Sequence, residues 1–267
     1  MKNILFVAHD DSGQEARLQC ALDVVRAVGG HLNCLDVAIS PLPMTDFAGA
    51  VYSQSAVIDE AIVVEQRNRE VLERRLQVEG MPYTWFEATA AMTDAILDHA
   101  LLNDLVVVNT PDGKRSLNPL DVARQIVSRV GRPIMLVPPR QRSLDVFGTA
   151  LVAWDGSPPA EVALRAAMPL LSLAERVVLL TIGDCDGLAS CEDAAAYCRR
   201  SNARVEIETL PKGLDKTDEV LSSFASAQQV DWVLMGAYGH SQVRETVFGG
   251  MTEAMIAHTK LPLIIAR

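Results

Sequence analysis

Residues 231–250 read DWVLMGAYGHSQVRETVFGG, and this stretch decides the fold. The apolar run from Trp232 to Met235 predicts a buried strand that ends in a loop. Four glycines frame that loop and the helix expected after it: Gly236, Gly239, Gly249 and Gly250. Glycine lets the backbone approach an anion closely, and a helix N-terminus adds unpaired N–H donors. The stretch is typical of a phosphate-binding loop in an α/β protein; the alternative is that the glycines only shape the loop.

The composition is that of a globular, acidic protein. The chain has 267 residues, enough for one large domain or two ordinary ones, and it is 49% hydrophobic and 22% charged. A net charge of −10 argues against general nucleic-acid binding and against docking on anionic membranes, but it leaves nucleotide binding open. The sequence enters a strand directly without a signal peptide, and no apolar run approaches the roughly 18 residues of a membrane span. We therefore expect a cytoplasmic protein.

The cysteines favour the same compartment. There are five of them, with no C-x-x-C pair: Cys20, Cys34, Cys185, Cys191 and Cys198. An odd number without paired spacing predicts reduced thiols, and without neighbouring histidines it predicts no metal site.

Strands and helices alternate along the chain, which predicts a mostly parallel sheet with helices on both faces. In the first half, strands are expected at 4–8, 31–38, 83–88, 105–109 and 134–137, with helices at 16–28, 56–78, 92–102 and 120–130. The second of these helices is long. Its apolar, core-facing side is expected to carry Val57, Ala61, Val64, Val71 and Leu76.

After a linker at 138–142 the sequence begins again, which indicates duplication of one unit. Ala150 to Ser157 matches Leu5 to Ser12, and Ala163 to Ala167 matches Arg17 to Ala21. Near the end of each half, the matching pairs are Asp231–Gly236 with Asp104–Asn109, and Leu261–Ile265 with Arg132–Leu136.

The spacing Gly-x2-Gly-x9-Gly, from Gly236 through Gly239 to Gly249, resembles the nucleotide-binding signature of the universal stress protein family. The family usually has Ser or Thr after the third glycine, whereas this chain has Gly250, so a hydroxyl donor to phosphate is missing. With the repeat, the chain resembles a tandem universal stress protein over essentially its whole length, most weakly at 39–55 and 183–195.

This resemblance implies an α/β fold with two tandem, open, five-stranded parallel sheets and helices on both faces, of the Rossmann-like, adenine nucleotide alpha hydrolase type. The two domains would span residues 1–140 and 148–267. Family members commonly associate through their last strand, so the closing strands at 134–137 and 263–266 are expected to face each other as a pseudo-dimer within the chain. A further homodimer is left open.

The resemblance also implies that the second domain binds an adenine nucleotide, ATP with or without Mg. The positions that match the family's site are Ala153, Asp155, Ile182, Met235, Gly236, Gly239, Gly249, Gly250 and Met251. They should converge at the carboxyl ends of the strands, where open parallel sheets bind ligands. Asp155 has an alternative or additional role as a cap of the next helix.

The first half departs from the pattern, because Asn109 and Asp112 replace Gly236 and Gly239. It is expected to be a degenerate copy that binds no nucleotide. No P-loop, Gly-x-Ser-x-Gly elbow or catalytic triad is found, so no catalytic residue is assigned. The sequence predicts a stress-response protein with ATP as a regulatory ligand and a protein partner of unknown identity. The alternatives are an interaction module whose nucleotide site has decayed, and a slow ATP hydrolase.

Overall fold

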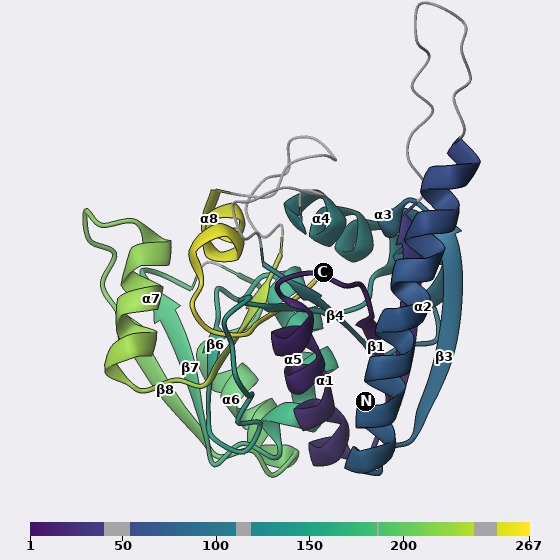
Figure 1. The fold of residues 1–267 in the computed structure, drawn as a ribbon. Coiled ribbons are helices and arrows are strands. Elements are labelled where there is room, and N and C mark those ends of the chain that lie inside the picture. The colour runs from purple at the N-terminus through teal and green to yellow at the C-terminus, as the bar shows by residue number, and fades with distance from the viewer. Residues whose placement is uncertain (40–53, 111–118, 186, 238–249) are drawn as a thin grey trace, which may run out of the picture.

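The structure is a computed structural model that describes residues 1–39, 54–110, 119–185, 187–237 and 250–267 (Figure 1). The first half contains β1 (Asn3–Val7), α1 (Gln14–Val28), β2 (His31–Ile39), α2 (Gln54–Glu79), β3 (Tyr83–Ala90), α3 (Met92–Ala100), β4 (Leu105–Asn109), α4 (Pro119–Val130) and β5 (Ile134–Val137). The second half contains β6 (Thr149–Ala153), α5 (Pro158–Leu171), β7 (Arg176–Ile182), α6 (Cys191–Arg200), β8 (Val205–Leu210), α7 (Thr217–Ala227), β9 (Trp232–Gly236), α8 (Gly250–His258) and β10 (Leu263–Ala266).

Each half contributes five parallel strands with the same topology, in the order β3-β2-β1-β4-β5 and β8-β7-β6-β9-β10. The expected α/β fold with two five-stranded parallel units is confirmed. The closing strands also meet as expected, because β5 and β10 pair antiparallel with Met135 opposite Ile264. The pairing also joins the two five-stranded sheets. The two units are not separate sheets but one continuous sheet of ten strands.

The seam between the halves is stable because both closing strands are short and wholly buried. All their side chains are apolar, and an unpaired edge there would leave backbone N–H and C=O groups without partners in the core. Helices cover the seam on both faces. On one face α1 lies against α5, and on the other an ion pair between Arg124 of α4 and Glu253 of α8 links the two halves.

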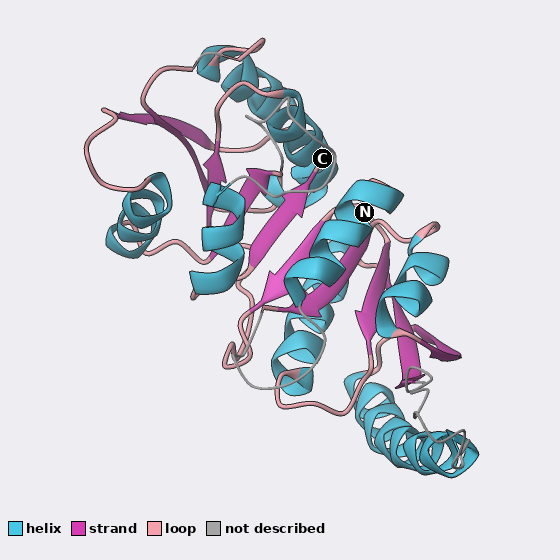
Figure 2. Cartoon of the chain, turned by 90° about the horizontal axis from the view of Figure 1, so that it is seen from above, coloured by secondary structure: helices cyan, strands magenta, loops and turns pink. Residues whose placement is uncertain are grey.

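Alternation along the strands divides the core into two layers (Figure 2). In β1, for example, Ile4 and Phe6 face the layer covered by α1, α2, α5 and α6, whereas Leu5 and Val7 face the layer covered by α3, α4, α7 and α8. Within the described residues, no helix is long and apolar enough to cross a membrane.

The strand register corrects the alignment of the two halves by one residue. Asp104 accepts a hydrogen bond from the Asn3 nitrogen (2.9 Å), and Asp231 accepts the equivalent bond from the Thr149 nitrogen (2.7 Å). Asn3 therefore corresponds to Thr149, whereas the sequence alignment had shifted the first strand by one position. As a result, the first-half equivalent of Asp155 is His9 and not Asp10.

The expected orientation of α2 was correct only in part: Leu76 is buried as predicted, and the side chain of Val57 lies outside the described residues. Val64 and Val71, assigned to the core side, are exposed, while Glu65 and Asn68 are buried. The physical reason is that the strand ends beneath α2 are polar. His9 Nδ1 lies 2.5 Å from the Glu65 carboxylate, and Asn68 exchanges two hydrogen bonds with Gln14. Apolar periodicity alone does not reveal that a helix packs through such polar groups.

Candidate functional site

Three of the sequence-predicted residues lie at the carboxyl ends of adjacent strands. Ala153 of β6 is opposite Met235 of β9, and Ile182 ends β7 on the other side of β6. Their side chains join one apolar cluster on the face covered by α7 and α8, and Met251 from the first turn of α8 packs against the same cluster. Met235 is buried, while the other three are half-exposed. The structure thus brings three expected pocket residues together at one strand edge, and Met251 packs against the apolar cluster on the same face of the sheet.

Asp155 lies in the turn between β6 and α5, and it is half-buried. Its Oδ1 accepts a hydrogen bond from the Ser157 nitrogen at 2.9 Å. The N-cap of α5 is Ser157, whose hydroxyl oxygen accepts from the Ala160 nitrogen at 3.4 Å. Asp155 therefore supports the turn that precedes the helix, while Ser157 supplies the cap itself.

Gly236 is needed for packing. A Cβ atom there would lie 2.4 Å from the Ala160 nitrogen and 2.7 Å from the Pro159 carbonyl carbon. The missing side chain lets the N-terminus of α5 approach the end of β9, as in close helix–strand packing at nucleotide sites. Gly250 begins α8 in open space, since a Cβ atom added there would meet nothing within 4 Å. Gly239 and Gly249 lie outside the described residues.

Part of this strand edge is formed by a loop to which the sequence assigned no role. The segment after β7 folds back onto the turn after β6, where the Leu188 nitrogen donates to the Gly156 oxygen (2.9 Å) and the Trp154 indole donates to the Ala189 oxygen (3.3 Å). Gly156 adopts a φ of +72°, and a Cβ atom at Gly187 would lie 2.1 Å from the Gly156 carbonyl carbon. The two glycines permit this close contact. They are the sequence signal that could have revealed it.

The sequence analysis also missed Leu210, which ends β8 and packs against the same apolar cluster as Ile182. The signal that could have revealed Leu210 was its position as the last residue of a strand.

All five cysteines are free. Burial, and then an electrostatic interaction and a hydrogen bond with Cys191, raise the pKa of Cys185. Among the described residues, no group of histidine, cysteine and acidic side chains is arranged to hold a metal ion.

The equivalent edge of the first half is filled by a polar network. Arg17 stands where the second half has Ala163, and its side chain is 3% exposed. Its guanidinium donates to the Val7 oxygen (2.7 Å) and the His9 oxygen (3.0 Å), and it also pairs with Asp11. Burial lowers the pKa of Arg17, although Asp11 opposes that shift. The buried guanidinium is thus well supplied with acceptors.

Asn109 completes this network at the position of Gly236. Its side-chain oxygen accepts from Arg17, and its nitrogen donates to the Gly13 and Val137 oxygens, each at 3.1 Å. The Asn109 side chain occupies the space next to Gly13, where a Cβ atom would lie 2.6 Å from it. Where the second half has a glycine and an alanine, the first half therefore has two interlocked polar side chains.

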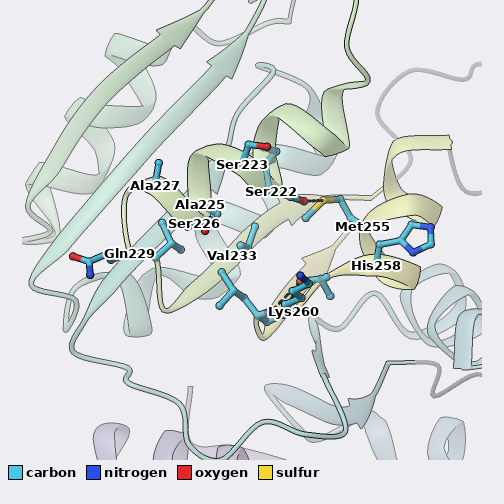
Figure 3. A pocket seen from close by; sticks show the side chains of 14 residues that line it. Ser222, Ser223, Ala225, Ser226, Ala227, Gln229, Val233, Met255, His258 and Lys260 are labelled. Carbon is cyan, nitrogen blue, oxygen red and sulfur yellow. Dashed lines mark hydrogen bonds between the residues drawn. The ribbon is translucent and has the colours of Figure 1, made fainter.

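A separate groove of about 700 Å³ lies between α7 and α8 (Figure 3). It is at the start of β9, away from the strand end that carries Gly236, and none of the sequence-predicted site residues lines it. The floor is apolar, from Leu221, Val233 and Met255, and the lining also carries the side chains of His258 and Lys260. This groove is distinct from the strand-end site.

The fold and this strand-end surface define a Rossmann-like α/β protein. Comparison with known proteins is more specific, because residues 186–267 match the model of the Universal stress protein family. A curated relative, universal stress protein Slr1230 of Synechocystis sp., is 24% identical over 148 residues, which cover 54% of this chain and 50% of that protein. The chain thus spans about half the length of this relative.

Solved structures extend the likeness in fold to the whole chain. A universal stress protein from Archaeoglobus fulgidus is similar with a TM-score of 0.74 at 15% identity, over 99% of this chain and 98% of that one. A putative universal stress protein from Pseudomonas aeruginosa gives 0.60 at 13% identity, over 100% and 93%. Residues 186–267 therefore match the universal stress protein family, and the entire chain shares its fold with these solved structures.

Proposed function

We propose that the second half of the chain binds one adenine nucleotide, ATP, as a regulatory ligand in a stress response. The observation that carries this proposal is the contrast between the halves. The strand-end surface of the second half combines Gly236 and Ala163 with a partly open apolar cluster, while the same edge of the first half is filled by Arg17 and Asn109.

The roles of the residues follow from their chemistry. Ala153, Ile182 and Met251 offer the apolar surface that an adenine ring needs, and Asp155 at the next position along the edge offers a carboxylate to a ribose hydroxyl. The phosphates would bind backbone N–H groups of the glycine-rich stretch and the N-terminus of α8, which begins at Gly250. Magnesium, where present, would arrive with the nucleotide. No catalytic role is proposed.

Calorimetric titration with ATP tests the proposal. The wild type should bind one ATP per chain, and Gly239→Val should lose binding because a β-branched side chain blocks close approach of the phosphates. Asp112→Val, the matched change in the first half, should leave affinity unchanged. Two sites per chain, or equal affinity in Gly239→Val, would place the ligand elsewhere.

Absence of heat in the wild type at millimolar ATP would favour an interaction module with a decayed site. Release of phosphate in the wild type, lost in Gly239→Val, would instead support a slow hydrolase. Mass spectrometry of any small molecule released on denaturation gives an independent reading of the bound ligand.

Gly250→Ser should tighten ATP binding. The substitution restores the hydroxyl that family members usually carry, and the added side chain meets nothing within 4 Å, so it fits without rearrangement of the described structure. One hydrogen bond to a charged group contributes about 1.5–3 kcal/mol, or about 10- to 150-fold in affinity. Gly250→Ala controls for the change in helix propensity at this position. If both variants bind equally tightly, the gain does not come from the hydroxyl.

A further inference from the structure

The long helix α2 exposes an apolar stripe. Val64, Val71 and Val78 lie seven residues apart and are 42%, 58% and 89% exposed. Seven residues make about two helical turns, so the three side chains follow one another along the same side of the helix. Val63, 43% exposed, widens the stripe. An exposed valine is ordinary, but a regular row of them on one helix is the geometry of a seam between helices.

The side of α2 that faces the rest of the chain is partly polar. Apart from Leu72 and Leu76, the described buried side chains of this helix are Glu65 and Asn68. Other contacts with α1 are also polar, since Arg75 donates to Gln19 at 2.9 Å and Glu79 accepts from Arg26 at 2.6 Å. The helix is thus held to the rest of the chain through polar groups and two buried leucines, while its valines remain exposed.

The position of α2 leaves this outward side open within the described part of the chain. The helix packs over β2 at the outer end of the sheet, beside the edge strand β3, and Figure 1 shows its outer side facing away from the other labelled helices. The seam formed by β5 and β10 is already used within the chain. A partner for α2 would therefore bind at a different surface.

The charge of α2 identifies a suitable partner. Residues 61–79 contain four arginines and four glutamates, of which only Glu65 is buried, so the accessible charges nearly balance although the chain as a whole carries a net charge of −10. On the valine side, Arg67 and Arg74 lie between the valines, with Glu70 beside them. Two copies of such a helix can place opposite charges around a shared apolar seam, and their contact avoids the repulsion expected between the more acidic surfaces.

We propose that two copies of this chain associate through α2, with the helices packed antiparallel about a twofold axis and the stripe of Val64, Val71 and Val78 at the centre. A twofold contact uses the same surface of both copies. A stripe of valines spaced seven residues apart can pair with itself in this way. The stems of Arg67 and Arg74 cover the seam while their guanidinium groups reach acidic groups of the other copy.

Sedimentation velocity of the full chain over a concentration series up to about 100 µM tests this proposal. The wild type should sediment as a dimer, and Val71→Glu should raise the dimer dissociation constant at least tenfold, because it places a charge in the seam of each copy. Because Val71 is exposed in the single chain, the circular dichroism spectrum of the Val71→Glu variant should equal that of the wild type. Val162→Glu, the same change at an exposed valine of α5, should remain dimeric.

Two outcomes would overturn the proposal. A wild type that stays monomeric over the whole series would mean that α2 does not associate with a second copy. A dimer that persists equally in Val71→Glu, and in a second variant with both Val64→Glu and Val78→Glu, would place the contact on another surface. The test does not depend on nucleotide binding, and it can be run without ATP.

Discussion

Arg17→Ala should lower the free energy of unfolding by about 3–5 kcal/mol, the usual cost of breaking a buried charged network. The guanidinium is almost fully buried, and its removal would leave the Val7 and His9 carbonyl oxygens and the Asn109 amide without their donor. The effect should be seen as a lower midpoint in denaturant titrations of the full chain. Arg165→Ala is the matched control. Its side chain is 60% exposed and pairs with Glu161 within α5, so less than about 1 kcal/mol should be lost.

A double-mutant cycle separates the network from simple loss of volume. Asn109→Gly alone should also be destabilising, and the double variant with Arg17→Ala should lose less than the sum of the single changes because both belong to one hydrogen-bonded unit. Strict additivity would contradict this network. The double variant also gives the first half the glycine and alanine of the second half. If it binds no second ATP, the glycine-rich stretch around Gly239 is required in addition to an unfilled strand end.

The sequence was sufficient to predict most elements because local patterns determine them. Trp232 to Met235 is an apolar run followed by glycine, and such a run has few alternatives to a buried strand in an alternating α/β chain. The duplication predicted equal topology in the two halves for the same reason. The pairing of β5 with β10 was also predicted, because family members commonly associate through their last strand and both closing strands here are short, apolar edges.

Other features depended on contacts between distant segments. Polar side chains of α2 face inward because they contact Gln14 and His9, which belong to other segments of the chain. The apolar periodicity of α2 itself contains no information about these contacts. Similarly, the local sequence around Arg17 is that of a surface position on a helix. Its hydrogen bond with Asn109, 92 positions away in the sequence, cannot be recognised from that local sequence. Among the candidate site residues, the apolar group was identified from the positions that match the family's site, whereas the contact of Gly156 with the loop after β7 was not identified.

The second large effect should be a pH dependence that originates at Asp36. This side chain of β2 is 5% exposed, and it lies near Glu65 and Arg69 of α2 and Glu87 of β3. Burial, and then the charges of Glu65 and Glu87, raise the pKa of Asp36 to about 7. Nearby, burial lowers the pKa of His9, but the adjacent Glu65 outweighs this and raises it overall. Both groups therefore hold protons more tightly in the folded state than in the unfolded chain.

The sign of the effect follows from this proton binding. Between about pH 4 and pH 7 the folded chain keeps a proton on Asp36 that the unfolded chain has released, so stability falls as pH rises through this range and then levels off. Taken alone, a shift to about 7 corresponds to about 4 kcal/mol as an upper limit. The contribution of His9 has the same direction, since it is fully present below the ordinary histidine pKa and is lost as pH rises through the folded one.

Asp36→Asn should therefore be more stable than the wild type at pH 8 and should show a flatter dependence between pH 5 and pH 8, because an amide of similar shape carries no charge to bury. Denaturant titrations at pH 5, 6, 7 and 8 measure both effects. His9 still titrates in the variant, so a weaker slope of the same sign should remain. Asp98→Asn, an exposed position on α3, should keep the full wild-type slope. An unchanged slope in Asp36→Asn would mean that another group controls the pH response, and His9→Asn would then be the variant in which the slope disappears.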